Sequence, residues 1–163
     1  MKAIRLKTEF LKCPIGADIQ KPLLTWNCEG GTKQTAYRIV AQTNGTVIWD
    51  SGKVESDSMR AIYPEPLCSR QRVDWSVTLW DEHGDGGEPT DAVFEMGLLD
   101  KSDWQAKWIS GNYTINSCKR YPVDCFKKEF DTSDVKKARI YASACGVYEL
   151  CLNGKRVGDF ILA

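Results

Sequence analysis

The chain has 163 residues, of which 42% are apolar, and its 22 basic and 22 acidic residues give a formal net charge of zero. This length allows one domain or two small ones with a buried core. The lack of a basic stripe argues against nucleic-acid binding, and no apolar run reaches the roughly 18 residues that would span a membrane. Residues 1–10 mix charged and apolar side chains and do not resemble a secretory signal, so we expect a cytoplasmic location.

The first expected strands alternate apolar and polar residues, which is typical of strands with one buried face. They lie at 23–28 and 34–42, and a short strand at 47–49 follows the second. Asn44-Gly45 predicts a tight hairpin turn between these last two, because both residue types tolerate the positive φ that such a turn requires.

The clearest alternation lies at 72–80, and short strands are expected at 59–63 and 92–96. Several short strands separated by turn signals predict a β-sandwich over residues 1–97. Trp26 and Trp75 lie at inward positions, and each indole would bury about 150–250 Å², so we expect them to anchor the core.

Residues 98–109 are predicted to be a linker, and Trp104 and Trp108 within it are expected to dock two modules together. Residues 110–163 predict an incomplete second β-sandwich, since a sheet this short buries too little surface alone. Its expected strands are 126–130, 138–144, 147–152 and 157–162, with a hairpin turn at Asn153-Gly154. The open edge near 157–162 favours either pairing with another copy, hence a homo-oligomer, or a poorly ordered second module.

The seven cysteines are irregularly spaced and form no CxxC motif, so we interpret them as reduced thiols used as small apolar residues. The densest polar cluster is a loop that contains Asp81, Glu82, His83, Asp85 and Glu88. Carboxylates can hold a hard cation, but this loop lacks regular calcium-loop spacing, and we interpret it as a solvated turn. A lone loop histidine makes nucleophilic catalysis a poor hypothesis.

Four segments, in order, resemble bacterial α-L-rhamnosidases of glycoside hydrolase family seventy-eight. "QTAYRIV" (34–40) and "WDSGKVES" (49–56) resemble the first, fibronectin type III-like domain of that family, which implies a fibronectin type III/immunoglobulin-like β-sandwich for residues 1–97. "GLLDKSDWQAKWI" (97–109) resembles the segment between its first two domains, and "YELCLNGKRVGD" (148–159) resembles the start of its second, jelly-roll-like domain. The resemblance therefore covers nearly the whole chain.

The resemblance implies that the parent enzyme removes terminal α-L-rhamnose by inverting hydrolysis, which needs two carboxylates held apart to admit a water. In that family these residues lie in a later helical (α/α) toroid, so the chain is expected to contain no catalytic residue and to have the rest of the parent polypeptide as its partner. The second domain of some members binds rhamnose with calcium. Here the region of Asn153, Arg156 and Asp159 is the expected carbohydrate contact, and Leu152 stands where some members have an acidic residue. No metal ligand or cofactor is therefore expected in this chain, although a complete second domain could hold calcium.

Other interpretations of the same residues stay open. Asn153-Gly154 is also explained as a plain type I′ turn, with Lys155, Arg156 and Asp159 as surface charges. Core or inter-domain packing explains four tryptophans better than the alternative, which is that they stack on sugar rings: Trp49, Trp80, Trp104 and Trp108. The main hypothesis is a non-catalytic N-terminal fragment of a rhamnosidase that is structural and assists carbohydrate binding. The alternative is a free-standing adhesive or protein-binding pair of β-sandwiches.

Overall fold

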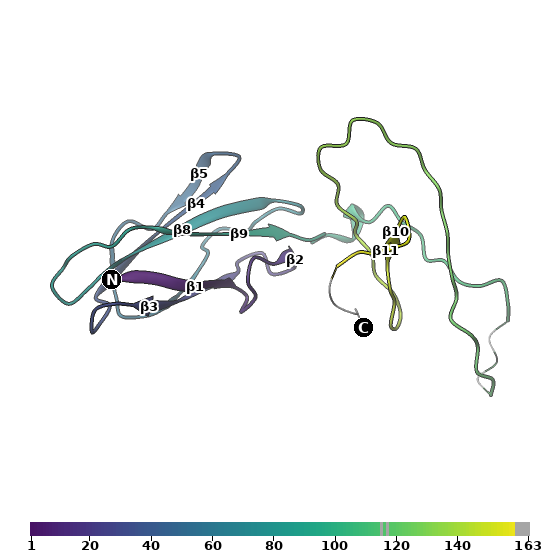
Figure 1. Cartoon of the computed structure of the whole chain (residues 1–163), viewed down its shortest axis with the longest axis horizontal. Helices are drawn as coiled ribbons and strands as arrows, with labels where there is room; N and C mark the ends of the chain where they lie inside the picture. Colours follow the sequence, from purple (N-terminus) through teal and green to yellow (C-terminus); the bar gives the residue numbers. More distant parts are fainter. Residues whose placement is uncertain (115, 117, 159–163) are drawn as a thin grey trace. The chain divides into compact units, whose positions relative to one another are not determined.

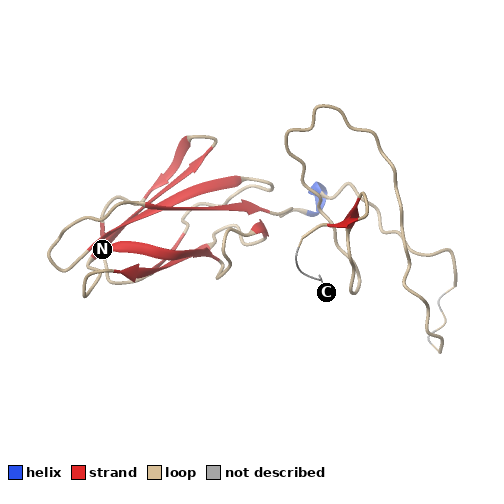
Figure 2. Ribbon diagram, viewed as in Figure 1, coloured by secondary structure: helices blue, strands red, loops and turns tan. Residues whose placement is uncertain are grey.

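The computed structural model describes residues 1–114, 116 and 118–158. It divides the chain into two compact units, Met1–Ala106 and Lys107–Ala163. The described residues of both units form strands and loops, apart from one short 3-10 turn at Lys101–Asp103 (Figure 2). The all-β fold class expected from the sequence is thus confirmed. No helix among the described residues is long and apolar enough to cross a membrane.

The first unit is a β-sandwich of two sheets (Figure 1). The smaller sheet has the order β1-β3-β7, with bounds β1 Lys2–Thr8, β3 Leu23–Glu29 and β7 Arg60–Ile62. The larger has the order β2-β9-β8-β4-β5, and β6 pairs with β4. Its bounds are β2 Ile15–Ala17, β4 Ala36–Thr43, β5 Thr46–Asp50, β6 Val54–Glu55, β8 Arg72–Trp80 and β9 Thr90–Met96. All pairings are antiparallel except β2 with β9.

The core lies between the two sheets and follows the predicted alternation. Along β8, the inward residues Val73, Trp75, Val77 and Leu79 are all at most 2% exposed. Trp75 stands opposite Ala41 on β4 and Ala92 on β9, so two small side chains make room for its indole. Trp26 on β3 is equally buried, and Tyr37 meets it edge to face with ring centroids 5.1 Å apart. Both predicted core anchors are confirmed.

The Asn44-Gly45 turn is also confirmed. Both residues have positive φ, 52° and 79°, and Thr43 pairs with Thr46 across the turn. This is the geometry of a two-residue type I′ hairpin, whose twist matches that of the flanking strands.

Three strands of this unit were not predicted. In β1 the buried residues are Ala3, Leu6 and Thr8, so the spacing changes from three to two. An irregularity between Ile4 and Lys7, with Arg5 at a φ of 53°, causes this change of phase. A bulge of this kind hides the period of two by which a strand is recognised. β2 and β6 are too short to show any period.

The second unit has one hairpin among its described residues, formed by β10 (Cys151–Leu152) and β11 (Lys155–Arg156). The strands predicted at 126–130 and 138–144 are wrong for this structure, because both segments are irregular. Their apolar side chains are exposed, at 53% for Phe126 and 50% for Ile140. A strand needs a neighbour for its backbone and a cover for its apolar face, and composition cannot report either. The strand expected at 157–162 lies mostly outside the described residues.

All seven cysteines are free thiols, but only Cys28 is even partly buried. The interpretation of the cysteines as small apolar core residues therefore holds for Cys28 alone. Burial raises the pKa of the Cys28 thiol.

Candidate functional site

The residues predicted to contact carbohydrate lie around the β10–β11 hairpin. Asn153 and Gly154 form its turn, with φ values of 51° and 76°, so the predicted type I′ turn is confirmed. The amide of Val157 donates to the carbonyl of Leu150 at 2.8 Å and extends the pairing beyond the two strands. This turn explains why Asn and Gly stand at these positions without reference to any ligand.

The structure places Asn153 and Arg156 on the same hairpin, and both are exposed. Arg156 stands opposite Cys151, whereas Asn153 is at the tip of the turn. Asp159, the third predicted contact, lies outside the described residues. Within the described part of the chain, no group of three or more His, Cys, Asp or Glu side chains is placed to hold a metal ion.

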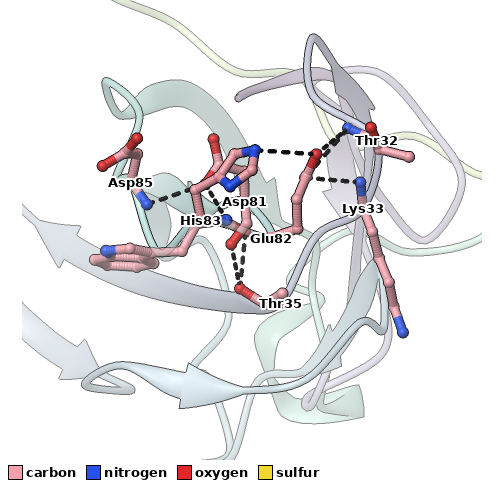
Figure 3. Close-up of polar contacts among 8 residues, drawn as sticks. Thr32, Lys33, Thr35, Asp81, Glu82, His83 and Asp85 are labelled. Atoms are coloured by element: carbon pink, nitrogen blue, oxygen red, sulfur yellow. Dashed lines mark hydrogen bonds and ion pairs between the residues drawn. The ribbon is translucent and has the colours of Figure 1, made fainter.

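The acidic loop after β8 is organised by its own carboxylates (Figure 3). One oxygen of Asp81 accepts hydrogen bonds from the amides of His83 and Asp85, both at 3.0 Å. The Thr35 hydroxyl donates to the Asp81 carbonyl at 2.6 Å and ties the loop to the start of β4. These contacts support the interpretation of the loop as a structural turn.

Glu82 binds the neighbouring loop that follows β3. Its carboxylate accepts from the amides of Thr32, at 3.1 and 3.2 Å, and of Lys33, at 3.1 Å (Figure 3). Gly30 and Gly31, both with positive φ, precede these amides and let the backbone turn them toward the carboxylate. Hydrogen bonds from the amides of Glu82 itself, Lys33 and Thr32 lower the pKa of this carboxyl to about 2. His83 Nε2 lies 3.9 Å from Glu82 Oε1.

This contact predicts a pH dependence of stability. The pKa of Glu82 is lower in the folded state than its ordinary value of 4.5, so the ionised carboxylate adds to the free energy of unfolding above pH 4.5. As the pH falls from 4.5 toward 2, the carboxylate is protonated and this contribution to the free energy of unfolding is lost. In urea unfolding at a series of pH values, Glu82→Gln should flatten the fall in unfolding free energy across this window. Glu88→Gln, an exposed residue of the same loop, should leave the slope unchanged; equal slopes for all three proteins would disprove the prediction.

The tryptophans do not gather into one platform in the first unit. Trp49 meets Tyr63 edge to face, with ring centroids 5.4 Å apart, and packs against the core. Trp80 carries the ammonium group of Lys53 over its ring, 5.2 Å from the centroid. Both indoles are therefore already used in packing. Trp104 and Trp108 are exposed, at 39% and 74%.

One pair of carboxylates shares an open groove of about 460 Å³ on the outer face of the larger sheet. Asp91 stands opposite Ser76, and Asp74 stands opposite Val93, so the two acids are diagonal neighbours roughly 7–8 Å apart. Inverting glycosidases also use two acids that flank the scissile bond. However, both acids are exposed, and Asp74 pairs with Arg72 at 2.9 Å. A general acid needs burial to stay protonated near neutral pH, and this face provides none.

The residue that the sequence interpretation missed is Gln34. It is 4% exposed, and its side-chain amide uses every hydrogen-bonding position. Its oxygen accepts from Trp26 Nε1 at 2.9 Å and from the Cys28 thiol at 3.3 Å. Its nitrogen donates to the carbonyls of Ser56 and Ser58, at 3.0 and 2.9 Å. The sequence offered only a glutamine at the start of an expected strand, and its hydrogen-bond partners lie up to 24 residues away in the sequence.

Comparison with known proteins places the chain in a family. The family described as "Rha78A-like, N-terminal immunoglobulin domain" matches residues 3–100, and "Alpha-L-rhamnosidase N-terminal domain" matches residues 133–163. An α-L-rhamnosidase of Formosa agariphila is 35% identical over 95% of this chain, and another of Streptomyces avermitilis is 37% identical over 68% of it. The chain spans 19% and 12% of these two relatives, respectively.

Solved structures agree with the sequence relatives. The crystal structure of Streptomyces avermitilis α-L-rhamnosidase, complexed with L-rhamnose, matches 67% of this chain and 12% of its own, with a TM-score of 0.61 and 34% identity. The Dictyoglomus thermophilum α-L-rhamnosidase matches 68% of this chain and 14% of its own, with the same TM-score and 30% identity. The chain therefore belongs to the Rha78A-like α-L-rhamnosidase family, from which it contains the N-terminal immunoglobulin domain and a matching part of the rhamnosidase N-terminal domain.

Proposed function

We propose that this chain is the non-catalytic N-terminal region of an α-L-rhamnosidase, and that the residues that cleave the glycosidic bond belong to other parts of the parent protein. The observation that carries the proposal is the coverage of the match. Nearly the whole chain aligns with a relative of which it forms only 19%. The matched families are both described as N-terminal domains.

The side-chain chemistry of the described residues supports the same proposal. Hydrolysis of a glycoside needs an acid and a base on opposite sides of a bound sugar. The carboxylates of Asp81 and Glu82 accept hydrogen bonds from backbone amides, and Asp74 and Asp91 lie on an open face of the sheet. The larger groove of about 630 Å³ beside β7 has Glu9 as its single acid, and that acid accepts from the amide of Leu23 at 2.5 Å.

The test is an assay of the purified chain with p-nitrophenyl α-L-rhamnoside. We expect no release of p-nitrophenol above the buffer rate, because no pair of carboxylates is buried in a cleft of the described residues. The matched control is a chain with Asp74→Asn and Asp91→Asn. Turnover well above buffer that these substitutions abolish would contradict the proposal.

We further propose that the polar side chains of the β10–β11 hairpin assist carbohydrate contact. Arg156 and Asn153 are exposed hydrogen-bonding groups on one hairpin, and loops at strand ends commonly carry binding residues. In an NMR titration with L-rhamnose, with and without calcium, the backbone amide resonances of this hairpin should shift. Arg156→Ala should make these chemical-shift changes smaller. Lys155→Ala, which changes the neighbouring residue of β11, is the control. Shifts that are the same in all three proteins, or no shifts at all, would refute this contact.

A further inference from the structure

The segment that follows β9 is fixed to the first sandwich by a set of hydrogen bonds centred on Ser69. The hydroxyl of Ser69, in the loop before β8, accepts from the amide of Leu99 at 2.8 Å. The same hydroxyl donates to the carboxylate of Asp103. One side chain thus holds both ends of the five-residue stretch between these two partners.

Arg70 adds two contacts from the same loop. Its amide donates to the carbonyl of Gly97 at 2.9 Å, and its guanidinium donates to the carbonyl of Asp103 at 3.2 Å. Arg70 has a φ of 64°, a left-handed conformation that is uncommon for a residue with a side chain. The backbone of the loop before β8 therefore places Arg70 where it contacts both Gly97 and Asp103.

Residues 100–103, which follow β9, also form a turn that is stabilised by their own hydrogen bonds. Asp100 caps the 3-10 turn by accepting from the amide of Ser102 at 2.7 Å. The carboxylate of Asp103 reaches back to the amide of Asp100 at 3.2 Å, which completes a capping box. The side chain of Leu99 is partly buried and packs against the hydrophobic core.

The residues that follow Trp104 differ from this segment in exposure and in secondary structure. Residues 105–110 are all exposed and belong to no helix or strand. The hydrogen bonds of Ser69 and Arg70 described above reach as far as Asp103, and the amide of Trp104 closes the turn by donating to the carbonyl of Lys101 at 3.2 Å.

We infer that residues 97–104 form a bracket that extends the first sandwich as one rigid body, and that the chain can first change direction at 105–110. The sequence alone assigned all of 98–109 to one linker. The bracket divides that segment into residues 98–104, which are fixed to the sandwich, and residues 105–109, which are not. The inference rests on the contacts above and does not depend on the proposed function.

Two lysines allow a direct test, because Lys101 lies inside the bracket and Lys107 lies beyond it, and both side chains are exposed. Trypsin cuts a folded chain only where the residues around the bond leave their contacts. A synthetic peptide of residues 95–112 supplies the intrinsic rates at the two bonds, including any effect of the neighbouring acids. We expect the ratio of cleavage after Lys107 to cleavage after Lys101 to be at least about tenfold higher in the full chain than in the peptide.

Substitutions within the bracket should remove this difference. Ser69→Ala and Asp103→Ala should each bring the ratio close to that of the peptide. Ser110→Ala and Asp91→Ala, matched changes at exposed positions outside the bracket, should leave it high. Equal ratios for the unsubstituted chain and the peptide would overturn the inference, whatever the variants do. An unchanged ratio in both bracket variants would overturn it as well. Cleavage within β8, after Arg72, reports any variant that has unfolded.

Discussion

Gln34→Leu is expected to destabilise the first sandwich by about 2–4 kcal/mol, because it leaves the buried indole N–H of Trp26 and two partly buried carbonyls without partners. Leucine has a similar size but no hydrogen-bonding group. The indole N–H of Trp26, which is 2% exposed, would lose its acceptor, and the carbonyls of Ser56 and Ser58 would lose their donor. Each such loss in a buried position costs about 1–3 kcal/mol, and partial relaxation toward water reduces the sum.

Thermal unfolding followed by circular dichroism measures this effect. For a unit of this size, the expected loss lowers Tm by roughly 10 °C or more. Gln105→Leu is the matched control, since Gln105 is exposed and lies beyond the sandwich strands. A Gln34→Leu variant that melts within a degree or two of the unsubstituted chain would show that the glutamine network does not hold the sandwich together.

Trp75→Ala is expected to cost about 3–5 kcal/mol, which is a large part of the 5–15 kcal/mol that typically stabilises a domain. The indole fills the space between two alanines, Ala41 and Ala92, on the neighbouring strands. Its removal therefore leaves a cavity that these small side chains cannot close. Denaturant unfolding should show a large fall in midpoint, or no folded baseline at all.

The comparison of Trp75→Phe with Trp26→Phe separates packing from hydrogen bonding. Both indoles are 2% exposed. The N–H of Trp26 donates to Gln34, whereas the buried N–H of Trp75 has no partner among the described residues. Phenylalanine at 75 removes an unsatisfied donor, so Trp75→Phe should cost clearly less than Trp26→Phe. The reverse order would mean that cavity volume, and not hydrogen bonding, decides the difference.

Much of the first sandwich could be predicted because its strands repeat with a period of two. β8 is the best case, since its inward and outward residues alternate without interruption over the whole strand. β1 was not predicted from the sequence, because the bulge at Arg5 changes the spacing of its buried residues. The turns at Asn44 and Asn153 were predictable for a local reason, because the residue type itself permits the backbone conformation.

The tertiary hydrogen bonds could not be predicted, since they join residues far apart in the sequence. Gln34 meets Ser58 across 24 residues, and Ser69 meets Asp103 across 34. The acidic loop was correctly interpreted as a turn, but the use of Glu82 to hold the loop at Thr32 depends on how two strand ends meet. In the second unit, apolar residues such as Phe126 and Phe130 predicted strands, but both side chains are exposed and neither residue pairs with another strand within the described part of the chain.

The proposed function requires that no side chain of this region takes part in cleavage of the glycosidic bond. Its most direct test is the kcat of the parent enzyme for an α-L-rhamnoside when Asp74→Asn and Asp91→Asn are introduced together. These are the two acids that line one open groove on the outer face of the larger sheet. We expect kcat to be unchanged in a protein with an unchanged Tm. A fall of about a hundredfold or more, as the loss of a general acid or base produces, would contradict the claim.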